Sequence, residues 1–187
     1  MSRLFHAVIG FLVASVLACP ACAAVADSAA NGFSVTESVH IAAPPDKVYG
    51  ELVHPSQWWS PAHTFSKSAA NLSLDARAGG CWCETLPDGG SAQHLIVYAA
   101  VPGKTLVLRG ALGPLQGLGV DGALRIDLRP GGDGTDVAVT YNVGGYLKDG
   151  LASWAAPVDE VLGVQFDRLK AQIETGSPDE TLKGAQP

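Results

Sequence analysis

The sequence has 187 residues, of which 47% are hydrophobic and only 16% are charged. So small a charged share excludes disorder driven by charge repulsion, and the length suits one domain with a substantial core. The 12 Lys and Arg residues stand against 18 Asp and Glu residues, for a net charge of −6. Because nucleic-acid binding needs a basic surface, we expect no nucleic-acid partner.

Residues 1–26 have the layout of a secretory signal peptide. A basic start at Arg3 precedes an apolar run that ends at Leu17, and small residues follow in Ala21-Cys22-Ala23 and Ala24-Val25-Ala26. The apolar run is shorter than the roughly 20 residues of a transmembrane helix. We therefore expect a periplasmic or secreted protein.

A second interpretation of the leader rests on Val16-Leu17-Ala18-Cys19, which resembles a bacterial lipobox. In that case the leader ends at residue 18 and Cys19 is acylated. The protein would then be a membrane-anchored lipoprotein. Contact with a membrane is expected only in this case.

The rest of the chain predicts a single domain over residues 33–176. Residues 24–32 are small and polar, and we expect the part that follows the signal peptide, residues 27–32, to be a flexible lead-in. Residues 177–187 predict a flexible tail.

Alternating apolar residues between Phe33 and Ile41 predict a half-buried strand, with Glu37 on its apolar face. Two short helices follow, one after Pro44-Pro45 and one around Trp58. The Gly-rich segment 113–122 lacks a nucleotide-binding spacing, and we interpret it as a flap at a cavity mouth. Further strands are predicted over 72–76, 81–86, 93–101, 105–112, 123–129 and 135–143.

The apolar spacing then changes to steps of three and four, which predicts a long amphipathic helix from about Leu151 to a stop at Gly176. Asp149 is its expected N-cap. Pro157 would be costly inside a helix, so the regular helix could instead begin near Ala156 with Pro157 in its first turn. The stripe consists of Leu151, Trp154, Val158, Leu162, Phe166, Leu169 and Ile173.

This order of elements predicts an α+β helix-grip fold. A curved antiparallel sheet of about six to seven strands surrounds the long C-terminal helix, with the two short helices after the first strand. One helix cannot fill such a sheet along its whole length, so we expect an elongated apolar cavity. The alternative is that bulky side chains fill it.

Several motifs resemble the START-like, or SRPBCC, superfamily, in the branch that contains activators of the heat-shock ATPase and polyketide-cyclase-like proteins. They are Ile41-Ala42-Ala43-Pro44-Pro45-Asp46-Lys47-Val48-Tyr49, then Leu52, Pro55 and Trp58-Trp59-Ser60-Pro61, then Pro102-Gly103-Lys104-Thr105-Leu106, and in the last helix Trp154, Leu162 and Leu169. The resemblance covers roughly residues 33–175.

The resemblance implies a helix-grip fold with a cavity for an apolar or amphipathic ligand. Functions in the superfamily range from lipid transport through ring cyclisation to co-chaperone action, so fold and chemistry must be judged separately. The exported leader departs from the ATPase-activating branch, and a cytosolic ATPase partner is therefore not expected.

Glu37 and Arg109 are the candidate catalytic residues. Burial on the apolar face would raise the pKa of Glu37 and suit it to acid–base chemistry. Arg109 lies in an otherwise apolar strand and could pair with Glu37 or hold a ligand carboxylate. The alternative is a structural ion pair or a sheet-edge position for Glu37.

The candidate ligand-binding residues are aromatic, with an apolar body and a polar tip, and ordinary core packing is their alternative role. His40, His63 and His94 could act as bases or metal ligands, but they lack a metal-binding spacing. We expect no metal and no cofactor. The aromatic candidates are Trp58, Trp59, Trp82, Tyr98, Tyr141 and Trp154.

Cys81 and Cys83 are the two cysteines of the predicted domain. A bridge between residues two apart in a strand would be strained, and Cys-x-Cys alone is a weak zinc signal. We interpret them as small, half-buried strand residues. Oxidation or metal binding is the alternative, and an exported compartment would permit oxidation.

Three functions follow from these observations. The first is an exported binding or carrier protein that holds a hydrophobic or amphipathic small molecule between sheet and helix. The second is a small-molecule enzyme of the cyclase or dehydratase type that uses Glu37 as acid or base. The third is a protein-interaction module that resembles a co-chaperone.

Overall fold

The computed structural model describes residues 24–180. The predicted signal sequence up to residue 23, including Cys19, and the tail residues 181–187 lie outside the described part. Eight strands form one antiparallel sheet in the order β1-β2-β8-β7-β6-β5-β4-β3. The strands are β1 Ala24–Ala29, β2 Gly32–Ile41, β3 Leu72–Leu74, β4 Cys81–Thr85, β5 Ser91–Val101, β6 Thr105–Arg109, β7 Gly119–Gly131 and β8 Gly134–Tyr146.

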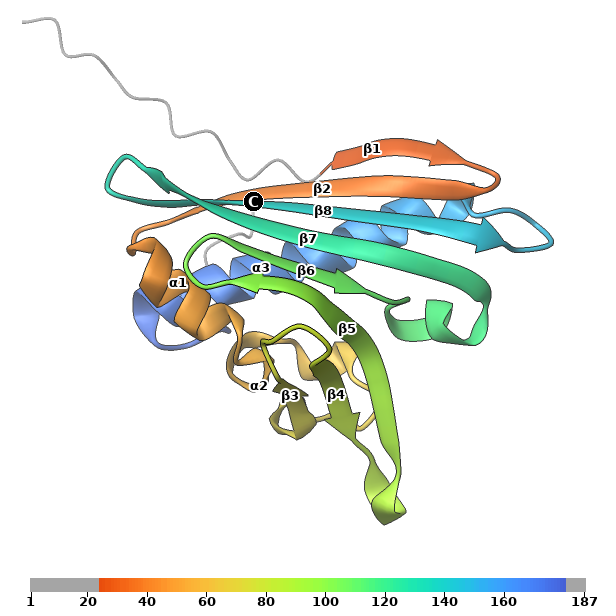
Figure 1. Ribbon diagram of the computed structural model, residues 1–187, viewed down its shortest axis with the longest axis horizontal. Helices are drawn as coiled ribbons and strands as arrows, with labels where there is room; N and C mark the ends of the chain where they lie inside the picture. Colours follow the sequence, from red (N-terminus) through yellow and green to blue (C-terminus); the bar gives the residue numbers. More distant parts are fainter. Residues whose placement is uncertain (1–23, 181–187) are drawn as a thin grey trace, which may run out of the picture.

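The sheet packs against one long C-terminal helix, α3, and two short helices follow the second strand (Figure 1). This arrangement confirms the predicted α+β helix-grip fold. The α-helices are α1 Pro45–Leu52, α2 Pro55–Trp58 and α3 Ala155–Thr175. The 3-10 helices are η1 Pro61–His63, η2 Ala69–Asn71, η3 Pro87–Gly89, η4 Gly113–Gly117 and η5 Ala152–Trp154.

The central strands have the alternation that the sequence predicts. In β2 every second residue from Phe33 to Ile41 is buried, and Glu37 is buried among them at 5% exposure. β2 pairs with β8 without a register shift, and β8 pairs in the same way with β7. These three strands therefore present one continuous apolar face to α3.

The lead-in differs from the prediction, because residues Ala24–Ala29 form strand β1 along β2. All six side chains are exposed, so their composition carries no apolar alternation. The pairing comes from the backbone, which satisfies the free hydrogen-bonding groups of β2. The structure thus has one strand more than the sequence predicts.

Helix α3 begins at Ala155 and ends before Gly176, which adopts φ 82° and caps the C-terminus as expected. Asp149 lies outside the helix and is not its N-cap. Pro157 lies in the first turn of α3. Backbone N–H groups there have no intrahelical acceptor, so the missing N–H of proline costs no hydrogen bond. Ser177–Glu180 follow the helix, and Asp179 forms an ion pair with the buried Arg168.

The sheet bends sharply at β5. Its pairing with β4 and with β6 shifts register once on each side, and Figure 1 shows β5 curving away from β6 toward β4 and β3. Such bulges increase local twist and bend the strand. The bend moves β3 and β4 away from the flat part of the sheet.

No helix within residues 24–180 is both long enough and apolar enough to cross a membrane.

Candidate functional site

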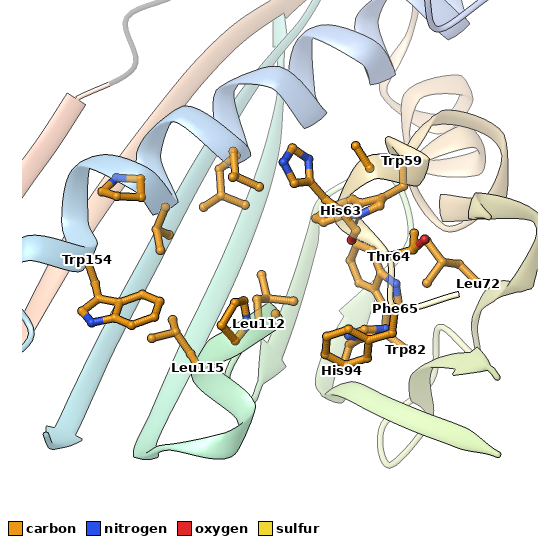
Figure 2. Close-up of a pocket in the computed structure, with 17 residues that line it drawn as sticks. Trp59, His63, Thr64, Phe65, Leu72, Trp82, His94, Leu112, Leu115 and Trp154 are labelled. Atoms are coloured by element: carbon orange, nitrogen blue, oxygen red, sulfur yellow. Dashed lines mark hydrogen bonds between the residues drawn. The ribbon is translucent and has the colours of Figure 1, made fainter. Parts of the chain in front are cut away.

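A pocket of about 410 Å³ lies between α3 and the bent end of the sheet, and its wall is mostly apolar. The first turns of α3 form one side, η4 forms the lower side, and β4 with the segment after α2 forms the opposite side (Figure 2). The volume is in the range of small-molecule sites. The predicted space between sheet and helix is therefore present at one end of α3.

Part of the predicted apolar stripe of the C-terminal helix lines this pocket and is not covered by the sheet. Leu162 is 2% exposed, whereas Trp154 and Val158 are only half-buried although they continue the same stripe. All three line the pocket. The half-buried members face the cavity instead of side chains of the sheet.

Tryptophan side chains form the floor. Trp59 and Trp82 line the pocket and meet edge to face, with ring centroids 5.1 Å apart. Trp58 is fully buried behind them, 5.4 Å from Trp59, and its indole N–H donates to the carbonyl of Glu51 at 3.1 Å. Of the predicted ligand-binding tryptophans, Trp59, Trp82 and Trp154 lie in the pocket wall and Trp58 supports it.

The two predicted tyrosines lie elsewhere. Tyr98 is 64% exposed, and the Arg109 guanidinium lies 5.8 Å from its ring centroid. Tyr141 is fully buried, donates to the carbonyl of Gly110 at 3.0 Å and accepts from the N–H of Leu112 at 3.0 Å. Tyr141 therefore fixes the turn that leads into η4, and neither tyrosine lines the pocket.

The predicted Gly-rich flap is partly regular structure. It contains η4 up to Gly117 and the beginning of β7 from Gly119. Gly113 and Leu115 line the pocket. The segment thus lies at the cavity, as expected, and supplies apolar wall there.

A buried acid–imidazole pair contributes polar groups to the pocket. Glu84 is 1% exposed and lies 2.9 Å from Nε2 of His94, which lines the pocket. The Glu84 carboxylate also accepts backbone N–H groups of Phe65 at 3.1 Å and Ser66 at 2.5 Å. Burial raises the pKa of Glu84, but the hydrogen bonds from Ser66, Phe65 and His94 outweigh it and hold that pKa below its usual value.

The second ring nitrogen of His94 is also occupied. Nδ1 lies 2.9 Å from the side-chain nitrogen of Gln116 in η4. Because the ionised Glu84 carboxylate can only accept, Nε2 of His94 carries a hydrogen. In the neutral imidazole Nδ1 is then the acceptor, and Gln116 covers it.

A β-bulge explains why His94 faces the pocket. Trp82 pairs with Leu95 and Cys83 pairs with Gln93, so His94 is the extra residue of β5. His94 and Leu95 are consequently both buried although they are adjacent. Strand alternation alone cannot place both side chains inside, so the sequence did not predict that His94 faces the pocket. The one sequence signal for Glu84 is that it lies two residues after Trp82 and therefore on the same buried face of β4.

His63 contributes the other imidazole. It belongs to η1, and Figure 2 shows it beside α3, on the opposite side of the pocket from His94. Its Nδ1 lies 2.9 Å from the side-chain nitrogen of Gln165, which is fully buried on α3. His40 is different, because it lies outside the pocket wall and pairs with Asp136 at 2.8 Å and Asp133 at 3.2 Å.

The structure does not bring Glu37 and Arg109 together. Glu37 is buried beneath α3 and does not line the pocket; burial and the nearby Asp159 and Asp167 carboxylates raise its pKa. Arg109 is exposed on the other face of the sheet and binds Asp121 at 2.5 Å. The predicted pair is therefore absent, because Leu106 and Leu108 face inward and alternation turns Arg109 outward.

Cys81 and Cys83 lie half-buried in strand β4, as predicted, but they also form a disulfide, which the sequence analysis gave as the alternative. Their Cα atoms are 5.4 Å apart, closer than the roughly 6.6 Å of a regular strand and within disulfide range. The register shift opposite Trp82 and Cys83 is the bulge of β5 at His94, so the disulfide lies across from the bend in β5. Within residues 24–180, no three His, Cys, Asp or Glu side chains group as a metal site.

Three solved structures share the architecture. CalU16 from Micromonospora echinospora has a TM-score of 0.55 and 15% identity over 87% of this chain and 89% of its own. DynU16, from the dynemicin biosynthetic locus, has a TM-score of 0.53 and 22% identity over 78% of this chain and 48% of its own. The Aha1 dimer from Colwellia psychrerythraea has a TM-score of 0.52 and 18% identity over 76% of this chain and 97% of its own.

The chain has the START-like, or SRPBCC, fold. At these identities the likeness concerns the fold alone, and the resemblance seen in the sequence is confirmed at that level. The sequence matches no protein-family model and no curated protein. Within the START-like fold, the chemistry of this chain must therefore be judged from its own pocket.

Proposed function

We propose that this protein binds and carries a hydrophobic or amphipathic small molecule in the pocket beside α3. The observation that carries the proposal is an apolar pocket of about 410 Å³ in which only a few polar side chains, among them His63 and His94, meet a wall rich in tryptophan. Apolar walls with few polar groups are typical of ligand sites. A START-like fold supports the same function.

The pocket also bears on the other two functions. A protein-interaction module would have been favoured by a filled interior, and the open pocket removes that support. Enzymatic chemistry at Glu37 is disfavoured because Glu37 lies outside the pocket wall.

Export is part of the proposal and rests on the leader sequence. Ala24 pairs with Thr36 and Val25 pairs with Val35 in β1, so cleavage after Ala26 would remove paired residues, whereas cleavage after Ala23 would keep them. We therefore expect N-terminal sequencing of the exported protein to begin at Ala24. A start at a modified Cys19 would support the lipoprotein alternative instead.

A plugging substitution tests the carrier function. Val158→Trp places an indole in the pocket, and Glu160→Trp makes the same change at an exposed α3 position outside the wall. We expect wild type and Glu160→Trp to bind anilinonaphthalene sulfonate with increased probe fluorescence, and Val158→Trp to lose most of this binding. Equal binding by all three proteins would contradict the proposal.

A second function, acid–base chemistry on the bound molecule, is favoured by the Glu84–His94 pair. Displacement of Gln116 by a ligand would leave His94 Nδ1 free to accept a proton, with Glu84 holding the ring by Nε2. Proton abstraction can be followed as deuterium incorporation into the methyl group of methyl naphthyl ketone in heavy water. Incorporation that is lost in His94→Phe would support this function, and equal rates with and without protein would exclude it for this ketone.

A further inference from the structure

Gln165 fixes which nitrogen of His63 carries a hydrogen. Its side-chain oxygen accepts the backbone N–H of Ser60 at 2.7 Å, and its side-chain nitrogen lies 3.3 Å from the carbonyl of Val161. A backbone N–H can only donate and a carbonyl can only accept. The orientation of the Gln165 amide is therefore set by two backbone groups and cannot be reversed without losing both bonds.

The orientation of Gln165 decides the tautomer of His63. The nitrogen that faces Val161 is the same one that lies 2.9 Å from His63 Nδ1. That nitrogen donates, so Nδ1 of His63 is the acceptor and carries no hydrogen. In the neutral imidazole the hydrogen is then on Nε2.

This Nε2–H has no partner within residues 24–180. The one hydrogen bond of the His63 ring goes to Gln165, and His63 lines the pocket. Both ring nitrogens of His94, in contrast, already have partners in Glu84 and Gln116. The backbone of His63 is also held, because its carbonyl accepts the indole N–H of Trp59 at 3.0 Å.

We propose that the ligand carries a carbonyl or carboxylate oxygen at one end of its apolar body, and that this oxygen accepts a hydrogen bond from His63 Nε2–H. The inference rests on the proposed carrier function, since it names the chemistry of the ligand in the same pocket. His63 is exposed where it lines the pocket. A ligand that covers the ring without offering an acceptor therefore removes water from this N–H and leaves it unpaired, so the oriented donor selects an acceptor. Gln165 acts as the positioning residue.

Three matched probes test the inference by competition with anilinonaphthalene sulfonate. Methyl naphthyl ketone carries the acceptor, ethylnaphthalene has nearly the same shape without it, and naphthoate offers a carboxylate. The quantity compared is the ratio of the ketone affinity to the ethylnaphthalene affinity within one protein. This ratio cancels any change in the affinity of the displaced dye or in packing.

In His63→Phe we expect this ratio to fall roughly three- to tenfold, the effect of one hydrogen bond. In His63→Gln, which keeps an N–H donor at the same distance from the backbone, we expect most of the ratio to be retained. A ratio equal in wild type and His63→Phe would overturn the inference and leave the carrier function intact. Failure of every probe to displace the dye from wild type would contradict the carrier function itself.

The naphthoate measurement separates the two sources of the acceptor. A larger loss for naphthoate than for the ketone in His63→Phe assigns the carboxylate, and the reverse assigns the carbonyl. Nitrogen NMR of the wild-type His63 ring gives a test that needs no variant. We expect a protonated Nε2 that shifts on ketone binding, and a protonated Nδ1 would contradict the inference.

Discussion

Glu37 on β2 and Asp159 on α3 bring their carboxyl groups near each other beneath the helix, and each has a buried oxygen with no hydrogen-bond partner among residues 24–180. Burial, followed by the charges of Asp159 and Asp167, raises the pKa of Glu37 to about 8. Glu37 is therefore protonated in the folded protein at neutral pH.

Glu37→Gln is expected to flatten the dependence of stability on pH. Below pH 4.5 the Glu37 carboxyl is protonated in the folded and the unfolded chain. Between pH 4.5 and about 8 only the unfolded chain loses the proton, so the free energy of unfolding falls by up to roughly 1.4 kcal/mol per pH unit. Urea unfolding across this range should show the slope in wild type and most of it removed in Glu37→Gln.

Glu160→Gln is the matched control, because Glu160 is exposed on the same helix. It should keep the wild-type slope. Parallel curves for wild type and Glu37→Gln would show that Glu37 is ionised in the folded protein.

Glu84→Gln is expected to destabilise the fold by about 1–3 kcal/mol at neutral pH. The Glu84 carboxylate accepts hydrogen bonds from Phe65, Ser66 and His94, whereas an amide presents one oxygen and an N–H that faces donors. Because the pKa of Glu84 is lowered in the folded state, its contribution is present above the unfolded pKa and lost as the pH falls. The difference between variant and wild type in urea unfolding should therefore shrink in acid, and a constant difference would contradict it.

Removal of the Cys81–Cys83 disulfide should cost little stability. The bond closes a very short loop, for which the chain-entropy relation gives roughly 1.5 kcal/mol. The cysteines are also on the strand face opposite Trp82, which is the residue of β4 in the pocket wall. The double variant Cys81→Ser, Cys83→Ser should thus keep dye binding, and a loss of binding would show that the disulfide shapes the pocket.

Arg109→Ala is expected to leave both the melting temperature and dye binding unchanged. Arg109 and Asp121 form an exposed ion pair on the sheet face opposite α3, and such pairs are screened by solvent. Thermal unfolding and the dye titration check this together. A clear loss of dye binding would mean that Arg109 contacts the ligand after all.

The sequence predicted the parts of the fold in which periodicity and burial agree. β2, β7 and β8 alternate strictly, and α3 carries its stripe up to Ile173. Glu37 followed from the same alternation, since a buried face was already defined by Val35 and Val39. Arg109 could have been placed by the same rule from Leu106 and Leu108.

The candidate site was less predictable, because it depends on departures from regularity. His94 faces the pocket because of a bulge in β5. Its partners Glu84 and Gln116 come from other segments of the chain, so three separate segments meet at this point. Tyr98 is likewise an extra residue of β5, between Val97 and Ala99 in the pairing with β6. Neither bulge has a signature in the composition of β5. β1 was missed because its six side chains are all exposed and carry no apolar alternation.

Native mass spectrometry of the protein, produced from the full 187-residue sequence and purified without denaturant, tests the carrier function most directly. We expect wild type and Glu160→Trp to carry a noncovalent small molecule that is released on unfolding, and Val158→Trp to be free of it. An empty wild-type protein, or the same molecule retained in full by Val158→Trp, would contradict a ligand site beside α3.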